Sequence, residues 1–315
     1  MAMRVLVTGG AGFLAKAMIR RLLQRGDSVV AFDTTVAALA DLQDAFGARL
    51  IAVAGDITDM SGIALAFKSH RPDAVVHCAA VVGMLATPIA AMRINVEGSV
   101  NVFDAMRLFG VRRCMHISSE ESYGPFQAAM ISEDHPQNPV TAYGISKLTV
   151  EHLSRSYRML HDLDVIHLRT SWVYGVTLPR NRIPKNLIDA ALAKRPLHLA
   201  HGGESAIDHT HIDDFASGAI LALDHPHHAY DAYNIGSGTA PTLYEVVETI
   251  KEIVPGADIS VGPGRYRYFG ELEICNKGAL DVSRARREFG YAPRFDFRAG
   301  VREYVERALH GRSTG

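Results

Sequence analysis

The sequence predicts an α/β protein with a doubly wound parallel sheet and a smaller, discontinuous α/β lobe. Short, nearly continuous apolar runs rich in β-branched residues alternate with amphipathic stretches along the first half of the chain. Such runs are typical of parallel strands that helices cover on both faces. The chain has 315 residues. One core tends to divide beyond roughly 250 to 300 residues, so we expect two lobes.

The expected strands and helices follow one another in regular order. A strand at residues 4–7 leads into a helix that ends at Gln24, and a strand at 28–32 leads into a second helix. Further strands are predicted at residues 50–53, 74–78 and 113–117. Strands that alternate with helices in this way indicate parallel βαβ units.

The alternation loosens after about residue 175, where prolines and arginines interrupt it. A strand at 232–236 is expected to return to the sheet, whereas 243–254 and 300–309 read as helices outside it. We therefore predict a dinucleotide-binding domain at residues 1–174, to which 208–238 return. Residues 175–207 and 239–315 should mainly form the substrate-binding lobe.

Composition excludes several classes of protein. Hydrophobic residues make up 48% and charged residues 21%, and the formal net charge is -1. This balance gives no overall field that would attract nucleic acid or a membrane surface. No signal peptide or membrane span is evident, and the three cysteines have no metal-like or disulfide spacing. We expect a cytoplasmic protein without a metal site.

A glycine-rich segment lies where the first strand turns into the first helix. Gly9, Gly10 and Gly12 lack the side chains that would keep the backbone away from a pyrophosphate. The amino terminus of the following helix offers free N–H groups to an anion. Because a strand and a helix flank these glycines, we predict a dinucleotide-binding turn.

Asp33 closes the second strand, at the spacing where a carboxylate binds the adenosine ribose. Thr34 and Thr35 follow it, so no basic side chain is present there to receive a 2′-phosphate. This arrangement favours NAD over NADP, although an aspartate at the end of a strand is also common in ordinary turns.

Tyr143 and Lys147 are four residues apart, so a helix would place them on one face. A free phenol has a pKa near ~10, and a neighbouring ammonium group favours the phenolate. Ser119 follows an apolar strand, at the edge where such sheets bind ligands. We predict that Tyr143 is a base, that Lys147 is its electrostatic partner and that Ser119 orients the substrate hydroxyl.

With these residues the chain resembles the extended short-chain dehydrogenase/reductase family, the NAD-dependent sugar epimerases and dehydratases, over nearly its whole length. Further motifs carry the resemblance: Gly55-Asp56-Ile57, His77-Cys78-Ala79-Ala80, Asn95-Val96-Glu97-Gly98, Leu168 to Gly175, His211-Ile212-Asp213-Asp214 and Tyr233 to Gly238.

The resemblance implies a Rossmann fold, NAD as the cofactor and hydride transfer at a secondary alcohol of a sugar or sugar-like substrate. The fate of the resulting ketone separates epimerases, dehydratases and dehydrogenases. The family also implies a homodimer formed by the helices after Pro88 and after Tyr143. It places these residues at the cofactor: Gly9, Gly12, Phe13, Leu14, Asp33, Asp56, Ile57, Ala79, Ala80, Asn95, Tyr143 and Lys147.

The chain departs from the sugar-nucleotide epimerases at two positions. Ile207 stands where they usually carry an arginine that binds phosphate, and Trp172 stands where asparagine is common. An aliphatic side chain does not neutralise a diphosphate. The remaining candidates for binding an anionic group of the substrate are Arg180, Arg182, Lys185, Arg265 and Arg267.

Glu120 and Glu121 occupy the positions where the family's dehydratases place an acid and a base. A charged pair after a strand is more often solvated, and we expect that here. The leading prediction is therefore epimerisation through a keto intermediate. A net dehydrogenase of a non-nucleotide sugar or hydroxy compound and a non-catalytic dinucleotide sensor are the alternatives.

Overall fold

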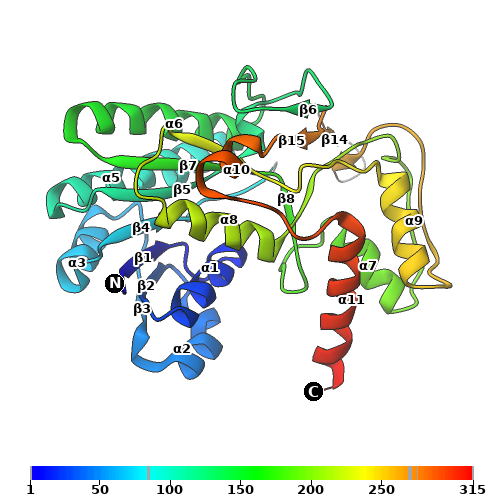
Figure 1. Ribbon diagram of the computed structural model, residues 1–315, viewed down its shortest axis with the longest axis horizontal. Coiled ribbons are helices and arrows are strands. Elements are labelled where there is room, and N and C mark those ends of the chain that lie inside the picture. Colours follow the sequence, from blue (N-terminus) through cyan, green and yellow to red (C-terminus); the bar gives the residue numbers. More distant parts are fainter. Residues whose placement is uncertain (1, 84–85, 269–271, 275, 314–315) are drawn as a thin grey trace.

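The structure is a computed structural model that describes residues 2–83, 86–268, 272–274 and 276–313. Within these ranges, seven parallel strands form one sheet in the order β11-β7-β5-β4-β1-β2-β3 (Figure 1). The strands are β1 (Arg4–Thr8), β2 (Ser28–Asp33), β3 (Leu50–Ala54), β4 (Ala74–His77), β5 (Arg113–Ser119), β7 (Asp164–Thr170) and β11 (Ala232–Ile235). The predicted doubly wound fold is confirmed. The direction of winding reverses between β1 and β4, and ligands bind at such a switch point.

Helices cover both faces of this sheet (Figure 1). Alternate residues of a strand point to opposite faces, so Val5 and Val7 join one core and Leu6 joins the other. The first core lies under α1 (Phe13–Gln24), α2 (Ala40–Phe46), α8 (Ile212–Asp224) and α10 (Ser283–Phe289). The second lies under α3 (Met60–His70), α5 (Gly98–Phe109) and α6 (Ala142–His161).

A third core lies beyond the carboxyl ends of the strands, toward the right of Figure 1. It is enclosed by α7 (Lys185–Leu192), α9 (Leu243–Ile253) and α11 (Phe297–Ser313), whose residues Leu187, Val246 and Val301 are fully buried. The parallel pair β9 (Leu197–Leu199) and β12 (Ile259–Val261) packs beside it. The helices predicted at 243–254 and 300–309 are thus present. The exact bounds of the two lobes stay a prediction.

The remaining elements are short. They are η1 (Val36–Leu39), η2 (Gly47–Arg49), α4 (Pro88–Ala90), the π-helix η3 (Ala91–Glu97), η4 (Glu120–Ser122), β6 (Met130–Ile131), β8 (Trp172–Tyr174), β10 (His209–His211), β13 (Arg267–Tyr268), β14 (Leu272–Glu273) and β15 (Ala279–Leu280). The strand β8 pairs in parallel with β10, and β6 pairs with β15. The segment around residues 276–280 is thereby brought back to the sheet edge.

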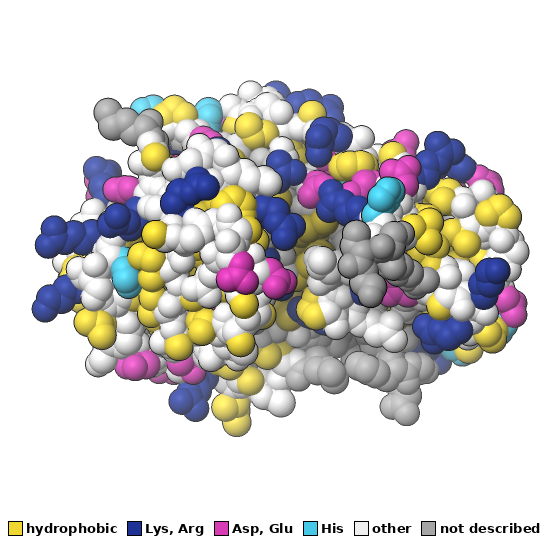
Figure 2. Space-filling model, turned by 90° about the horizontal axis from the view of Figure 1, so that it is seen from below, with side chains coloured by type: hydrophobic (Ala, Val, Ile, Leu, Met, Phe, Trp, Pro, Cys, Tyr) yellow, Lys and Arg dark blue, Asp and Glu magenta, His cyan; other side chains and the backbone are white. Residues whose placement is uncertain are grey.

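The surface carries charges of both signs. On the face shown in Figure 2, lysine and arginine side chains alternate with aspartate and glutamate. Within the described part of the chain, no helix combines the length and apolar character that crossing a bilayer requires.

Candidate active site

The glycine turn between β1 and α1 has the geometry that a dinucleotide needs. Gly9 has a φ of +65°, and a Cβ atom there would lie 2.7 Å from the backbone of Ala79. A side chain at this residue is therefore excluded both by conformation and by space. Gly12 precedes α1 and makes no side-chain cap, so the first N–H groups of the helix, at Phe13 and Leu14, are left for an anion.

Asp33 ties the glycine turn to the end of β2. Its Oδ2 accepts a hydrogen bond from the Ala11 N–H at 3.0 Å, and its Oδ1 accepts one from the Thr35 N–H at 2.9 Å. Oδ1 also accepts a longer hydrogen bond from the Thr34 hydroxyl at 3.4 Å, whereas Oδ2 keeps a second lone pair that suits a ribose hydroxyl. These residues fit NAD, as the sequence predicted.

The next two loops of the sheet carry the other predicted cofactor residues. Asp56 follows β3 and accepts a hydrogen bond from the Thr58 N–H at 2.8 Å. Ile57 is buried against Gly98, where a Cβ atom would lie 2.4 Å from its side chain. Asp56 is thus placed at the sheet edge, while Ile57 mainly anchors the loop to α5.

Asn95 lies in the π-helix η3, a distortion that often marks functional sites. Its Oδ1 accepts from the Val81 N–H at 2.8 Å, and its Nδ2 donates to the Val81 carbonyl at 3.0 Å and to Ser146 Oγ at 2.8 Å. Asn95 therefore fixes the loop that contains Ala79 and Ala80 against α6. We interpret it as a residue that shapes the cofactor site.

The predicted catalytic residues meet beyond the end of β5. Thr141 caps α6 by accepting a hydrogen bond from the Gly144 N–H at 3.0 Å, and this sets the first turn of the helix. In that turn Tyr143 lies beside Ser119, whose hydroxyl lowers the pKa of the phenol. Lys147, one turn further along, places its Nζ 5.8 Å from the centre of the Tyr143 ring. The sheet and α6 thus bring together the three residues to which the sequence assigned catalysis.

Burial changes the proton affinity of this pair. Burial raises the pKa of Tyr143 to about 12, against the effect of its hydrogen bond with Ser119. Burial also lowers the pKa of Lys147 to about 8. The Lys147 ammonium group donates to the Ile117 carbonyl at 2.6 Å and lies 3.3 Å from His116 Nε2. At neutral pH Lys147 is therefore charged, as its predicted role requires.

The expectation that Glu120 and Glu121 are solvated was wrong for Glu120, which is only 1% exposed. The Lys277 Nζ lies 2.9 Å from Glu121 Oε1 and 3.6 Å from Glu120 Oε1. Burial raises the pKa of Glu120, and Lys277 opposes that shift. Sequence reasoning did not find Lys277, because only the pairing of β15 with β6 brings it to the carboxylates.

The candidate anion ligands divide into two kinds. The Lys185 ammonium group is engaged by Asp189 and by Tyr304, whose hydroxyl lies 3.2 Å away. The Arg182 guanidinium group instead stacks 3.8 Å above the Trp172 ring. In the described ranges no carboxylate forms an ion pair with Arg182, and its Nε is buried without a hydrogen-bond partner.

The position of the missing arginine and the remaining candidate cations lie in the second lobe. Ile207 is fully buried in the third core. Arg265 and Arg267 form ion pairs with Glu273 at 3.4 and 3.6 Å. Of Arg182, Lys185, Arg265 and Arg267, only Arg182 forms no ion pair with a carboxylate of the described residues, although its charge lowers the pKa of the buried Glu120.

The fold and this geometry define a dinucleotide-binding protein with a tyrosine, a lysine and a serine at the switch point of its sheet. Residues 5–236 match the model of the NAD dependent epimerase/dehydratase family. The chain belongs to this family and is an NAD-dependent enzyme of the extended short-chain dehydrogenase/reductase type.

Known proteins resemble the chain over almost its whole length. It is 31% identical to the UDP-glucose 4-epimerase of Mycolicibacterium smegmatis, with 96% of this chain and 98% of that protein covered. It is 30% identical to the dTDP-glucose 4,6-dehydratase of Neisseria gonorrhoeae, with 96% and 94% covered. The crystal structure of Thermus thermophilus UDP-glucose 4-epimerase in complex with NAD superposes with a TM-score of 0.81 at 26% identity, covering 96% and 98%.

Proposed function

We propose that the protein transfers hydride between NAD and a secondary alcohol of a sugar or sugar-like substrate, and that it epimerises this carbon through a keto intermediate. The position of Tyr143 beside Ser119, with Lys147 one turn further along α6, supports the proposal. Bound NAD supplies a hydride acceptor at its nicotinamide ring.

The side chains of the site bind the substrate hydroxyl and accept its proton. Ser119 holds the substrate hydroxyl against Tyr143, and the Tyr143 oxygen takes the hydroxyl proton. The Lys147 ammonium group favours the phenolate form of Tyr143 through its charge. Glycines at residues 9 and 12 let the pyrophosphate approach the sheet, so that the reacting carbon and Tyr143 meet at the same edge.

The test replaces Tyr143 by phenylalanine. Tyr143→Phe removes the proton acceptor and should reduce turnover about 10²-fold to 10⁴-fold. NAD binding, followed by quenching of intrinsic fluorescence, should persist. Normal turnover in this variant would refute the assignment. No turnover by the wild-type enzyme across a broad sugar panel would favour the dinucleotide-sensor alternative.

NADH absorbance separates epimerisation from net oxidation. An epimerase returns each hydride to the substrate, so NADH does not accumulate, whereas a dehydrogenase accumulates NADH with each turnover.

The Arg182 guanidinium, which forms no ion pair with a carboxylate among the described residues, supports a substrate that carries its own anionic group. Buried Ile207 argues against neutralisation of a diphosphate at that position.

Dehydration is the second candidate, and the contacts of Ser171 support it. Ser171 Oγ lies 2.8 Å from Glu120 Oε2 and 2.7 Å from the Asp208 carbonyl oxygen. Each of these short contacts needs a proton, but the hydroxyl has only one and the carbonyl has none. We infer that Glu120 carries the second proton. Glu120 would then be a neutral acid, and Glu121 would be an ionised carboxylate paired with Lys277. Elimination requires such a pair, one group that donates a proton and one that accepts it.

Product analysis distinguishes this candidate. A dehydratase that returns the hydride after elimination forms a deoxy-keto product, which mass spectrometry detects by the loss of one water. Glu120→Gln would abolish that product and leave the oxidation of the alcohol by NAD, with Tyr143 as the base, in place. A product with the mass of the substrate excludes elimination.

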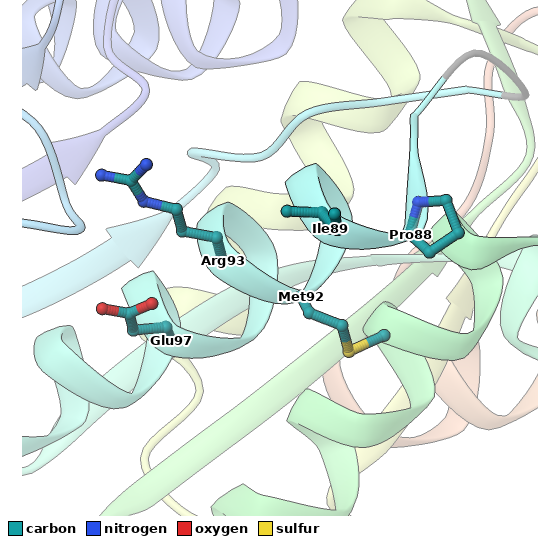
Figure 3. A pocket seen from close by; sticks show the side chains of 5 residues that line it. All are labelled: Pro88, Ile89, Met92, Arg93 and Glu97. Carbon is teal, nitrogen blue, oxygen red and sulfur yellow. The ribbon is translucent and has the colours of Figure 1, made fainter.

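We also propose that the protein is a homodimer and that it acts in the cytoplasm. Ile89 is 81% exposed on α4 and lies with Pro88 and Met92 beside a shallow pocket that Arg93 and Glu97 complete (Figure 3). An apolar surface next to charged residues is typical of a subunit interface. Light scattering should report two chains for the wild type and one for Ile89→Asp. Leu65→Asp, at a 63% exposed residue of α3, is the matched control that should remain dimeric.

A further inference from the structure

A chain of buried side chains runs behind Lys147, from α6 across β5 to β7 and back to α6. Lys147 Nζ lies 3.3 Å from His116 Nε2, and His116 Nδ1 lies 3.0 Å from His167 Nδ1. His167 Nε2 in turn lies 2.7 Å from Ser154 Oγ. All four residues are at most 2% exposed. In a buried series of polar side chains, each donor and acceptor needs a hydrogen-bond partner.

The number of available protons fixes the direction of each hydrogen bond that links these four side chains. Ser154 Oγ donates to the Glu151 carbonyl at 2.8 Å, so its only proton is used there. His167 Nε2 must then donate to Ser154, and in a neutral ring His167 Nδ1 becomes an acceptor. His116 Nδ1 therefore carries the proton between the two rings. The His116 Nε2 lone pair is left to accept from Lys147.

Both rings are neutral, because burial disfavours their charged forms. Burial lowers the pKa of His167 to about 4, and burial together with the charge of Lys147 holds the pKa of His116 well below its ordinary value. His116 therefore accepts a hydrogen bond from Lys147 without taking its proton. The positive charge stays on Lys147.

The charged groups near Lys147 leave this arrangement undisturbed. It is faced by His77 at the end of β4, whose pKa burial lowers to about 3, and by Cys78 just after β4, whose pKa burial raises to about 12. On α6 itself lie Tyr143 and Glu151, and Glu151 is bound by Arg169 at 2.6 Å. The ammonium group is therefore held by two neutral acceptors, His116 Nε2 and the Ile117 carbonyl.

We propose that His116 and His167 are positioning residues that fix the Lys147 ammonium group beside Tyr143 through this one-way chain of hydrogen bonds. An ammonium group has three N–H bonds, and His116 and Ile117 take two of them in defined directions. The direction of the third N–H bond is thereby fixed, because the ammonium group cannot rotate freely. This inference rests on the proposed roles of Tyr143 and Lys147, to which it adds the group that orients the lysine.

The test measures the ionisation of Lys147 and needs no substrate. The ε-carbon resonance of Lys147, assigned by its loss in Lys147→Met, is titrated by NMR in the wild type and in two variants. His116→Leu removes the acceptor for the charged form, so the acid dissociation constant of Lys147 should rise about tenfold. His116→Gln can offer an oxygen in the same direction and should restore most of the wild-type value.

Ser154→Ala keeps the test decisive if His116→Leu does not fold. Without Ser154 the tautomers of His167 and His116 are no longer fixed, and the constant should rise about threefold. His211→Leu removes a buried histidine that bonds Glu303 instead, and it should leave the constant unchanged. A folded His116→Leu or Ser154→Ala protein with the wild-type constant would overturn the proposal. Failure of catalysis alone would refute only the proposed function.

Discussion

Gly144 packs so closely against Glu121 that a Cβ atom at residue 144 would lie 2.3 Å from the Glu121 carbonyl oxygen. The first turn of α6 can press against η4 only because residue 144 has no side chain. This approach brings Tyr143, the preceding residue, beside Ser119. The position of the proposed base thus depends on a glycine to which no chemical role is assigned.

Gly144→Ala should therefore damage catalysis more than folding. The added methyl group has to push α6 away from η4, and a displacement of about 1 Å at the reacting groups can cost about 10²-fold in rate. Turnover and thermal unfolding are measured together. Gly290→Ala is the control for strain without a clash, because Gly290 has a positive φ of 73° but a Cβ atom there meets nothing within 4 Å. Equal loss of turnover in both variants would contradict the prediction.

The pH dependence of catalysis should report Lys147. Burial lowers the pKa of this group to about 8, so its ammonium form is present below that pH and is lost above it. We expect kcat/KM to fall as the pH rises through about 8, because the neutral amine no longer favours the phenolate. In Lys147→Arg the guanidinium stays charged, and any residual activity should lack this alkaline fall. An unchanged profile in that variant would assign the fall to another group.

Glu151 and Arg169 form an ion pair in the core, with both side chains at most 3% exposed. Burial opposes the charge on Glu151, but Arg169 and a hydrogen bond from Ser118 together lower its pKa to about 2, from an ordinary value of 4.5. A lowered pKa in the folded state stabilises the protein above about pH 4.5. That contribution is lost as the pH falls from there toward 2.

Glu151→Gln should lower the free energy of unfolding by about 3 to 5 kcal/mol, because it leaves Arg169 buried without its counter-ion. The variant should also lose most of the dependence of stability on pH between 4.5 and 2. Glu252→Gln breaks the exposed pair with Arg298 and should cost about 1 kcal/mol or less. Denaturant unfolding at several pH values measures both. Similar losses in the two variants would contradict a buried ion pair.

The Glu151–Arg169 ion pair also explains why the sequence did not predict the strand β7. The first five strands to appear in the chain are apolar runs, and their pattern was sufficient to predict them. In β7, His167 and Arg169 interrupt the run, although both point into the interior. Their partners, Ser154 and Glu151, come from α6 and become visible only when the fold places the helix over the strand.

In the candidate site, too, residues in local motifs could be predicted, whereas residues brought in by distant segments could not. The grouping of Ser119, Tyr143 and Lys147 could be predicted because each follows a local motif with a known spacing, while their catalytic roles stay a prediction. Lys277 could not, since an isolated lysine outside any periodic segment gives no signal until β15 pairs with β6. The wrong expectation for Glu120 has the same origin. A carboxylate after a strand is usually solvated, and here Lys277 and Ser171 cover it from segments distant in sequence.

Arg182 and Lys185 were indistinguishable in the sequence as anion ligands, but their contacts now separate them. The Arg182 guanidinium stacks on Trp172 and meets no carboxylate in the described part of the chain, whereas Asp189 and Tyr304 already hold Lys185. A half-buried cation without a counter-ion gains more from an anionic ligand than a cation that is already paired. Arg182→Gln should therefore raise KM at least about tenfold for an acidic sugar, with a smaller change in kcat, because it removes binding that the ground state and the transition state share. Lys185→Gln should leave KM within about twofold under the same steady-state assay. If Lys185→Gln had the larger effect on KM, the anionic group of the substrate would have to bind farther into the second lobe than Trp172.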